Sequence, residues 1–246
     1  MKQKLLTITT TVILAVFLTG CTTGSDKGPN TLTRAESKAG WTLLFDGTTT
    51  EGLRGYNMPD FPSENWEVID GTLHCHGVGK GDMTNTDIIT VNKYGNFELS
   101  LEWKISEGGN SGIFFLAQEI PGKEIYQSSP EMQVLDNKNH PDTAGVGGNH
   151  QAGSLYDLIP AVPQNALPFG EWNQVRIMIN QGEVVLSQNG VNVVKFTLWT
   201  DEWREMCANS KFRDWDMFVN TAKEGYIGLQ DHGTEVWYRN LKIKEL

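Results

Sequence analysis

The chain has 246 residues, of which 39% are hydrophobic, and its formal net charge at pH 7 is −10. This length suits one large β domain or two small domains, and it allows a substantial core. The acidic balance argues against nucleic acid as a partner, because affinity for nucleic acid depends on neutralising phosphates. It also disfavours electrostatic attachment to anionic lipid surfaces.

The N-terminus has the layout of a bacterial lipoprotein signal peptide. Lys2 and Lys4 form a basic start, residues 5–18 form an apolar run with scattered Thr, and Leu-Thr-Gly-Cys at 18–21 resembles a lipobox. The apolar run is shorter than the about 20 residues that a membrane span needs. We expect residues 1–20 to be removed as a signal peptide and Cys21 to carry the lipid. An ordinary secreted protein with an incidental Cys is the alternative.

This assignment predicts where the protein works. Loss of residues 1–20 changes the net charge from −10 to −12, so the lipid must supply the attachment to the membrane. We expect a protein anchored to a bacterial membrane that faces the periplasm or the cell surface. Residues 21–39 follow as the lipidated Cys and a small, polar, Gly-Pro-containing tether, which is typical of disorder. Residues 40–246 form the folded domain, without an internal boundary.

From residue 40 onward the sequence alternates between strand patterns and turns. Residues 66–75 and 182–196 predict hairpins, with Asp70-Gly71 and Asn189-Gly190 at their turns. The clearest strand pattern is 96–105, where apolar residues occupy every second position. Further strands are expected, in chain order, at 41–47, 111–117, 131–136, 172–179, 225–233 and 236–246. Residues 199–224 break this rhythm and predict a loop with a short helix.

Strand patterns of this kind favour an all-β fold. About ten to twelve strands, Gly-rich turns and no long amphipathic helix are typical of a β-sandwich. No repeat of 20–50 residues occurs, which argues against a propeller or a solenoid. Besides Cys21, the chain has Cys75 and Cys207, which either pair in an oxidising compartment or stay as buried thiols.

The segment 131–136 carries the first candidate site. Met132 and Val134 alternate with Glu131 and Gln133, so a core-facing Met132 would leave Glu131 and Gln133 together on the opposite face. A Glu and a Gln side by side can bind or protonate a polar ligand, and Asp136 follows at the strand end. A solvated outer sheet face is the alternative.

Histidines supply a second set of candidates. His is the side chain best suited to proton transfer near neutral pH, and loops on a rigid scaffold often carry function. The five histidines lie in or beside predicted turns, at His74, His76, His140, His150 and His232. His74 and His76 would share one strand face, and a metal site there is conceivable, although no carboxylate or third His has a fixed spacing to them. Ordinary surface polar groups are the alternative for each one.

Aromatic residues are numerous, with 8 Trp and 6 Tyr. Aromatic rings offer flat apolar surfaces on which sugar rings stack. Trp199, Trp203 and Trp215 in the irregular segment either line a groove or pin that segment to the sandwich. No Gly-x-Ser-x-Gly, Walker or His-Glu-x-x-His motif occurs, so serine-hydrolase, nucleotide and zincin functions lack their signatures.

Eight sequence pieces in order resemble the 3-keto-disaccharide hydrolase family. They are WTLLFDG…GLRGY, WEVIDGTLH, FELSLEWKIS…GGNSGIFF, SPEMQVLDN, AGSLYDL, EWNQVRI, SKF and GYIGLQDHG…VWYRNLKIKEL. The resemblance runs from about residue 40 to 245. It implies a concanavalin-A-like jelly-roll β-sandwich related to laminarinase-type glucanases, and secreted or lipoprotein forms in bacteria that degrade glycans.

The chemistry that the resemblance implies is cleavage of glycosides already oxidised at C3 of the sugar. A ketone at C3 acidifies the hydrogen on C2, a base removes that proton, the bond from C1 to the leaving oxygen breaks, and water adds later. This route needs one base, one acid and donors for the enolate oxygen. Ordinary glycosidases instead use two carboxylates, about 5–5.5 Å or about 6.5–9.5 Å apart.

The resemblance also suggests roles for individual residues. Laminarinase-type relatives carry further carboxylates where this chain has Gln133, which fits a site with one acid–base carboxylate and an amide donor. We expect Glu131 to act as acid–base, and His150 or His232 to be the second proton shuttle or to stabilise the enolate. The expected substrate-binding residues are Gln133, Asp136, Gln230, Tyr156, Arg176 and Trp199. Asp136 either orients one histidine or binds metal.

The sequence predicts no particular cofactor, and binding of a divalent metal remains an alternative. The expected partners are an oligosaccharide or glycoside substrate and, through the lipid, a membrane. Two other functions remain as alternatives. One is a non-catalytic surface glycan-binding lipoprotein, because sandwich folds also serve lectins. The other is a laminarinase-like endoglucanase, against which Gln133 counts.

Overall fold

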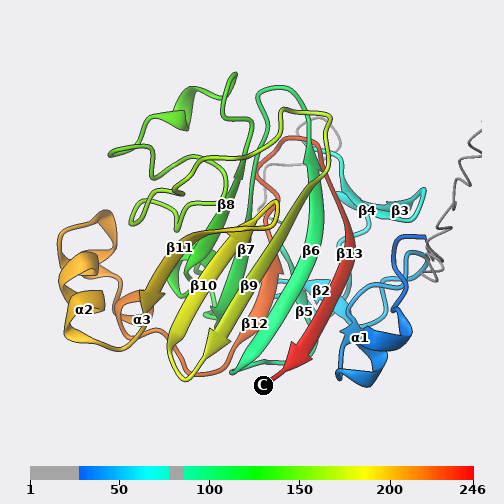
Figure 1. Ribbon diagram of the computed structural model, residues 1–246, viewed down its shortest axis with the longest axis horizontal. Helices are drawn as coiled ribbons and strands as arrows, with labels where there is room; N and C mark the ends of the chain where they lie inside the picture. Colours follow the sequence, from blue (N-terminus) through cyan, green and yellow to red (C-terminus); the bar gives the residue numbers. More distant parts are fainter. Residues whose placement is uncertain (1–27, 78–85) are drawn as a thin grey trace, which may run out of the picture.

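Two antiparallel β-sheets face each other in the computed structural model, which describes residues 28–77 and 86–246 (Figure 1). Sheet A has the strand order β11-β10-β9-β6-β13-β4-β3, with β1 beside β13, and sheet B has the order β2-β5-β12-β7-β8. The predicted all-β, concanavalin-A-like jelly-roll β-sandwich is confirmed. The predicted signal peptide and the predicted lipidation site Cys21 lie outside the described residues.

The elements have the following bounds. Sheet A contains β1 (Thr42–Leu43), β3 (Trp66–Ile69), β4 (Thr72–Cys75), β6 (Phe97–Ile105), β9 (Asn173–Asn180), β10 (Glu183–Gln188), β11 (Val191–Thr197) and β13 (Val236–Glu245). Sheet B contains β2 (Leu53–Gly55), β5 (Ile88–Thr90), β7 (Asn110–Ala117), β8 (Glu131–Leu135) and β12 (Tyr226–Leu229). The helices are α1 (Arg34–Lys38), α2 (Asp201–Ala208) and α3 (Asp216–Val219), and the short 3₁₀ turns are η1 (Ile125–Gln127), η2 (Pro141–Thr143) and η3 (Lys211–Asp214).

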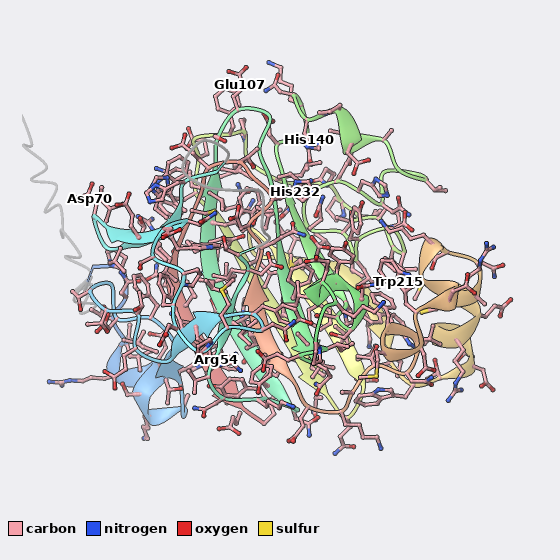
Figure 2. All side chains as sticks on the ribbon, turned by 180° about the vertical axis from the view of Figure 1, so that it is seen from behind. Arg54, Asp70, Glu107, His140, Trp215 and His232 are labelled. Carbon is pink, nitrogen blue, oxygen red and sulfur yellow. The ribbon has the colours of Figure 1, made fainter. Side chains whose placement is uncertain are left out.

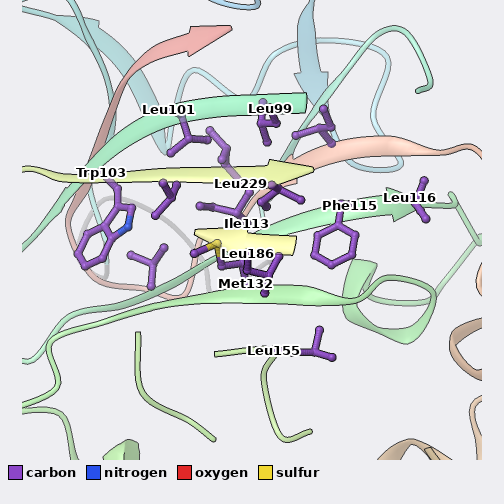
Figure 3. Close-up of a cluster of buried hydrophobic side chains, with 14 of the residues drawn as sticks. Leu99, Leu101, Trp103, Ile113, Phe115, Leu116, Met132, Leu155, Leu186 and Leu229 are labelled. Atoms are coloured by element: carbon purple, nitrogen blue, oxygen red, sulfur yellow. The ribbon is translucent and has the colours of Figure 1, made fainter. Parts of the chain in front are cut away.

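The hydrophobic core lies between the two sheets (Figure 3). Every second residue of β6 from Phe97 to Ile105 is buried, as the alternation predicts. From sheet B, Ile113 of β7 and Met132 of β8 enter the same cluster. Burial of large apolar side chains is worth about 1.5–3 kcal/mol each, so this interface between the sheets holds the sandwich together.

The segment after β11 is more helical than expected. Residues 199–224 contain α2, η3 and α3, which lie together at one end of the molecule (Figure 1). Trp203 is fully buried, and its indole Nε1 donates to the backbone oxygen of Val219 at 2.9 Å. Its ring stacks against Phe196 and Phe218, so this tryptophan pins the helical segment to β11 of the sandwich.

The structure differs from the expected tether over residues 28–39. Asn30 Nδ2 donates to the backbone oxygen of Gly71 at 2.8 Å, and the backbone nitrogen of Asn240 donates to Asn30 Oδ1 at 2.8 Å. Thr33 and Glu36 form a capping box on α1, and Lys242 pairs with Glu36. Small polar residues are typical of disorder, but here their side chains bond to the turn before β4 and to β13. Residues 21–27 lie outside the described residues.

The cysteines Cys75 and Cys207 are unpaired and buried. Burial raises the pKa of the Cys75 thiol, and it raises that of Cys207 to about 12, so both stay neutral thiols in the core. Of the helices in the described residues, none combines the length and hydropathy that a membrane crossing requires.

Candidate active site

A cleft of about 470 Å³ lies on the outer face of sheet B, where η3 and α3 approach it. Trp215 and His232, both labelled in Figure 2, belong to its wall. It combines acidic, amide and aromatic side chains, which come from Asp87, Asn110, Tyr126, Ser129, Glu131, Gln133, Tyr156, Lys211, Phe212, Trp215, Phe218, Gln230, Asp231 and His232.

Glu131 lies at the base of this cleft. Met132 and Val134 of β8 enter the core, so the alternation turns Glu131 and Gln133 to the outer face of the sheet, as predicted. The carboxyl group lies against Gly112 of the neighbouring strand β7, where any Cβ would collide with it. Glu131 is only 7% exposed, and burial raises its pKa to about 8, although nearby Lys211 opposes this shift.

Two glutamines flank this carboxyl group. When the Gln133 amide is oriented with its donors toward acceptors, Nε2 donates to Glu131 Oε1 at 3.0 Å and to the backbone oxygen of Ser111 at 3.2 Å. Gln230 is buried, and its Oε1 has no hydrogen-bond partner among the described residues. An unpaired buried amide oxygen is costly, so Gln230 is suited to receive a hydroxyl donor from a ligand.

Two aspartate residues, Asp87 and Asp231, form another part of the wall. Asp231 Oδ2 accepts from Thr86 Oγ1 at 2.6 Å and from Asn65 Nδ2 at 3.0 Å. The backbone nitrogen of Asp231 donates to Asp87 Oδ1 at 2.9 Å. Burial raises the pKa of Asp87 to about 8, so Asp87 is mostly protonated at neutral pH and can donate a proton.

The remaining wall is aromatic. Tyr126 and Trp215 lie with ring centroids 5.6 Å apart, and Phe212 packs edge-on against Trp215 at 5.2 Å. Lys211 places its ammonium group 4.1 Å from the centre of the Tyr156 ring. Flat apolar rings beside polar groups are the surfaces on which sugar rings stack. Of the three tryptophans expected in the irregular segment, Trp215 lines the cleft.

The two predicted catalytic histidines differ in position. His232 is exposed and contributes to the cleft wall. His150 does not line the cleft, because it packs 4.6 Å from the Tyr156 ring. Its Nδ1 lies 2.8 Å from Asp142 Oδ1 and its Nε2 lies 2.8 Å from Asp157 Oδ1. Burial lowers the pKa of His150, but hydrogen bonds to Asp157 and Asp142 outweigh burial and raise it above its usual value. His150 therefore supports the Tyr156 ring from outside the cleft.

Three predicted substrate-binding residues also lie outside the cleft. Asp136 Oδ2 accepts from the backbone nitrogen of Gly108 at 2.8 Å, which closes a turn. Arg176 pairs with Glu98 on the outer face of sheet A. Trp199 donates from Nε1 to the backbone oxygen of Thr221 at 2.7 Å and packs against the core. The structure therefore brings together Glu131, Gln133, Tyr156, Gln230 and His232 from the predicted set.

The cleft also contains residues that the sequence analysis did not single out. Asp87 precedes β5, a three-residue strand without a clear alternation, and Tyr126 lies in the short turn η1. Lys211 and Phe212 occur in the SKF piece of the family resemblance, which was the available signal for them. No local sequence pattern places these residues beside Glu131, because the tertiary structure brings them there from distant parts of the chain.

Within residues 28–77 and 86–246, one group of His, Cys, Asp and Glu side chains has the spacing of a metal site. It consists of Glu67, His74 and His76, whose ligand atoms all lie within 4.8 Å of one another. None of these three residues lines the cleft.

Comparison with known proteins gives consistent results. The sequence model of the 3-keto-alpha-glucoside-1,2-lyase-like domain matches residues 40–244. A 3-keto-disaccharide hydrolase of Bacteroides thetaiotaomicron is 47% identical over 229 residues, which cover 84% of this chain and 79% of that protein.

Solved structures agree with this assignment. A candidate glycosyl hydrolase of Parabacteroides distasonis has a TM-score of 0.81 at 30% identity, over 89% of this chain and 100% of that one. A second one from the same species has a TM-score of 0.66 at 26% identity, over 84% of this chain and 99% of that one. The chain therefore belongs to the 3-keto-alpha-glucoside-1,2-lyase-like family of carbohydrate-active enzymes.

Proposed function

We propose that the protein cleaves glycosides whose sugar carries a ketone at C3, by removing the proton on C2 and then eliminating the leaving group. The observation that carries this proposal is Glu131, buried in a sugar-sized cleft with a pKa near 8 and held by the Gln133 amide, so that it can act as a base near neutral pH. A general base whose pKa lies near the operating pH is the group that proton abstraction requires.

The steps follow from the chemistry of the ketone. The Glu131 carboxylate takes the proton from C2, and the electron pair of the C–H bond forms an enolate with the C3 oxygen. When the carbonyl re-forms, a C1–C2 double bond appears, the bond from C1 to the leaving oxygen breaks, and that oxygen takes a proton. Water then adds across the double bond, so the sum of the steps is hydrolysis. No covalent bond between sugar and protein forms.

The cleft supplies the other groups for this route. Gln133 holds Glu131 in place by hydrogen bonding, and the Gln230 amide and the Lys211 ammonium are donors for the enolate oxygen and for sugar hydroxyls. Two groups in the wall can protonate the leaving oxygen. Asp87 is mostly protonated at neutral pH, and His232 lies exposed to the incoming ligand.

The test compares a 3-keto-glucoside, such as 3-keto-trehalose, with its unoxidised parent sugar, in buffers with and without chelator. In D₂O, we expect the oxidised sugar to be consumed and its product to carry deuterium at C2, because water returns that hydrogen. Equal consumption of the two sugars, or a product without deuterium at C2, would contradict the proposal. Calorimetric binding of glycans without turnover would favour the glycan-binding alternative.

The leaving-group acid is assigned by two single variants. Asp87→Asn and His232→Gln are compared on substrates with a good and a poor leaving group. Loss of the acid should slow cleavage of the substrate with the poor leaving group by a factor of about 10²–10⁴, and it should slow cleavage of the substrate with the good leaving group much less. The variant that shows this difference identifies the acid, and equal effects in both substrates would exclude that residue from the role.

We also propose that the protein is lipid-anchored at Cys21 and faces the periplasm or the cell surface. The basic start, the apolar run and the Leu-Thr-Gly-Cys sequence at 18–21 support this location. Metabolic labelling with a fatty acid should label the chain, and Cys21→Ala should remove the label. Labelling that persists in Cys21→Ala would exclude this attachment site.

A further inference from the structure

Two histidines and a glutamate meet on the outer face of the β3–β4 hairpin. Leu73 and Cys75 of β4 enter the core, so His74 between them points away from it. Glu67 of β3 is the direct cross-strand partner of His74. His76 follows two residues later, and its ring lies 4.9 Å from that of His74. The hairpin therefore supplies the carboxylate that the sequence alone did not place beside these histidines.

The distances in this cluster suit a tetrahedral metal ion. Glu67 Oε1 lies 3.2 Å from His74 Nδ1 and 3.5 Å from His76 Nδ1, and the ligand atoms of the three residues all lie within 4.8 Å. Zinc bonds to nitrogen and oxygen of about 2.0–2.1 Å place neighbouring tetrahedral ligands about 3.3 Å apart. Small movements of the Glu67 side chain, which is 41% exposed, are enough to complete that geometry.

The His74 ring is held in the orientation that such a site needs. It stacks on the Trp237 ring with centroids 4.7 Å apart and planes 3° apart. Its Nε2 is buried without a hydrogen-bond partner in the described chain, and Glu235 Oε1 lies 3.4 Å from it. Histidines that bind metal through one nitrogen commonly donate from the other to a carboxylate, which fixes the tautomer. Glu235, 51% exposed, has the freedom to turn and accept that bond.

We propose that Glu67, His74 and His76 bind a divalent transition-metal ion of the Zn²⁺ type. The ligands are one Glu67 carboxylate oxygen and the Nδ1 atoms of His74 and His76, and water occupies the fourth position. Imidazole and carboxylate ligands suit Zn²⁺ and Co²⁺, whereas Mg²⁺ prefers oxygen ligands alone.

This site is separate from the cleft, because its residues lie on the outer face of sheet A and Glu131 lies on that of sheet B. Its role is structural. The ion would tie β3 to β4, and Asn65 at the start of this hairpin donates to Asp231 in the cleft wall. Metal binding therefore stabilises one wall of the cleft without supplying chemistry to it, and the proposal does not depend on the substrate.

The experiment titrates the full chain, without a histidine tag and stripped by chelator, with Zn²⁺ and with Co²⁺. We expect one ion per chain at micromolar concentration, and a visible Co²⁺ absorption of tetrahedral intensity. Glu67→Gln and His76→Gln should each weaken binding at least tenfold, whereas Glu64→Gln, an exposed carboxylate just before β3, should leave it unchanged. An excess of Mg²⁺ should not displace the ion.

Each variant is first checked for native circular dichroism, and Glu67→Gln is the decisive one because its side chain is partly exposed. Absence of binding at micromolar Zn²⁺ would overturn the proposal. So would unchanged affinity in both Glu67→Gln and His76→Gln, which would place the ion elsewhere on the chain. An octahedral Co²⁺ spectrum would contradict the ligand geometry.

Discussion

Replacing Glu131 by Gln should change the stability of the protein in a direction that its burial determines. In the unfolded chain a Glu ionises near 4.5, whereas burial in the cleft raises the pKa of Glu131 to about 8. Between these pH values the native state holds a proton that the unfolded state has lost. The free energy of unfolding therefore falls as pH rises from about 4.5 to about 8, and it is highest, as far as this group is concerned, below 4.5.

The size of this effect follows from the same two values. At pH 7, which is 2.5 units above the pKa of about 4.5 in the unfolded chain, Glu131 is ionised in the unfolded state but still mostly protonated in the native state. The buried carboxyl group therefore lowers the free energy of unfolding at pH 7 by about 3 kcal/mol. Gln has nearly the same shape and does not titrate. Glu131→Gln should therefore be more stable than the wild type at pH 7 and about equally stable at pH 4.

Catalysis should change in the opposite direction. Loss of the base should lower kcat by a factor of about 10²–10⁴, which is the usual contribution of general acid–base catalysis. Substrate binding should change little, because the amide keeps the volume of the carboxyl group. More than a tenth of wild-type activity in Glu131→Gln would refute the catalytic role.

Differential scanning calorimetry between pH 4 and 8 tests the stability argument. Glu183→Gln is the matched control, since Glu183 is an exposed strand residue far from the cleft. We expect the gap in melting temperature between Glu131→Gln and the wild type to widen as pH rises, and the control to follow the wild type. Parallel curves for Glu131→Gln and the wild type would refute the burial argument.

Other expected outcomes concern the same site and its scaffold. In the proposed mechanism Glu131 must be ionised while the leaving-group acid stays protonated, so kcat/KM should rise with pH toward about 8 and fall at higher pH, and a flat profile would argue against this mechanism. Trp215→Ala should raise KM about tenfold with little change in kcat, because it removes a stacking surface; an unchanged KM would exclude it from binding. Gly112→Ala should abolish activity, because its Cβ collides with the catalytic carboxyl group, and wild-type turnover would contradict this packing. Asn30→Ala should lower the free energy of unfolding by about 2 kcal/mol in urea titrations, because it removes hydrogen bonds to Gly71 and Asn240; an unchanged midpoint would mean that this contact is not stabilising.

Most of the sheet structure was predictable, because alternation of apolar residues is a local signal. The alternation in β6 and β9 predicted both the strands and their buried faces. The strands β2 and β5 were missed because three residues are too few to show a period of two. The tether was misjudged at residues 28–39, since composition does not show that Asn30 finds partners more than 200 positions away at Asn240.

The strand pattern predicted only the part of the candidate site that lies on a strand, whereas Tyr156, Gln230 and His232, outside the strands, were expected through the family resemblance. Glu131 and Gln133 follow from the alternation in β8, and the structure places both in the cleft. Loop residues gave no such guide, because their orientation depends on tertiary contacts. His150 illustrates this, because its contacts with Asp142 and Asp157 hold it beside Tyr156 but outside the cleft. Asp87 was missed for the same reason, because a different strand carries it to the cleft.

The position of α1 has a consequence for how the protein meets its substrate. In both whole-molecule views α1 lies at one end of the long axis, and the α2–α3 segment that borders the cleft lies at the other (Figures 1 and 2). The described part of the chain thus begins at the end of the long axis that is remote from this helical wall of the cleft. If the proposed lipid at Cys21 is present, the membrane attachment would join the domain near α1, and the helical wall of the cleft would lie at the opposite end of the domain.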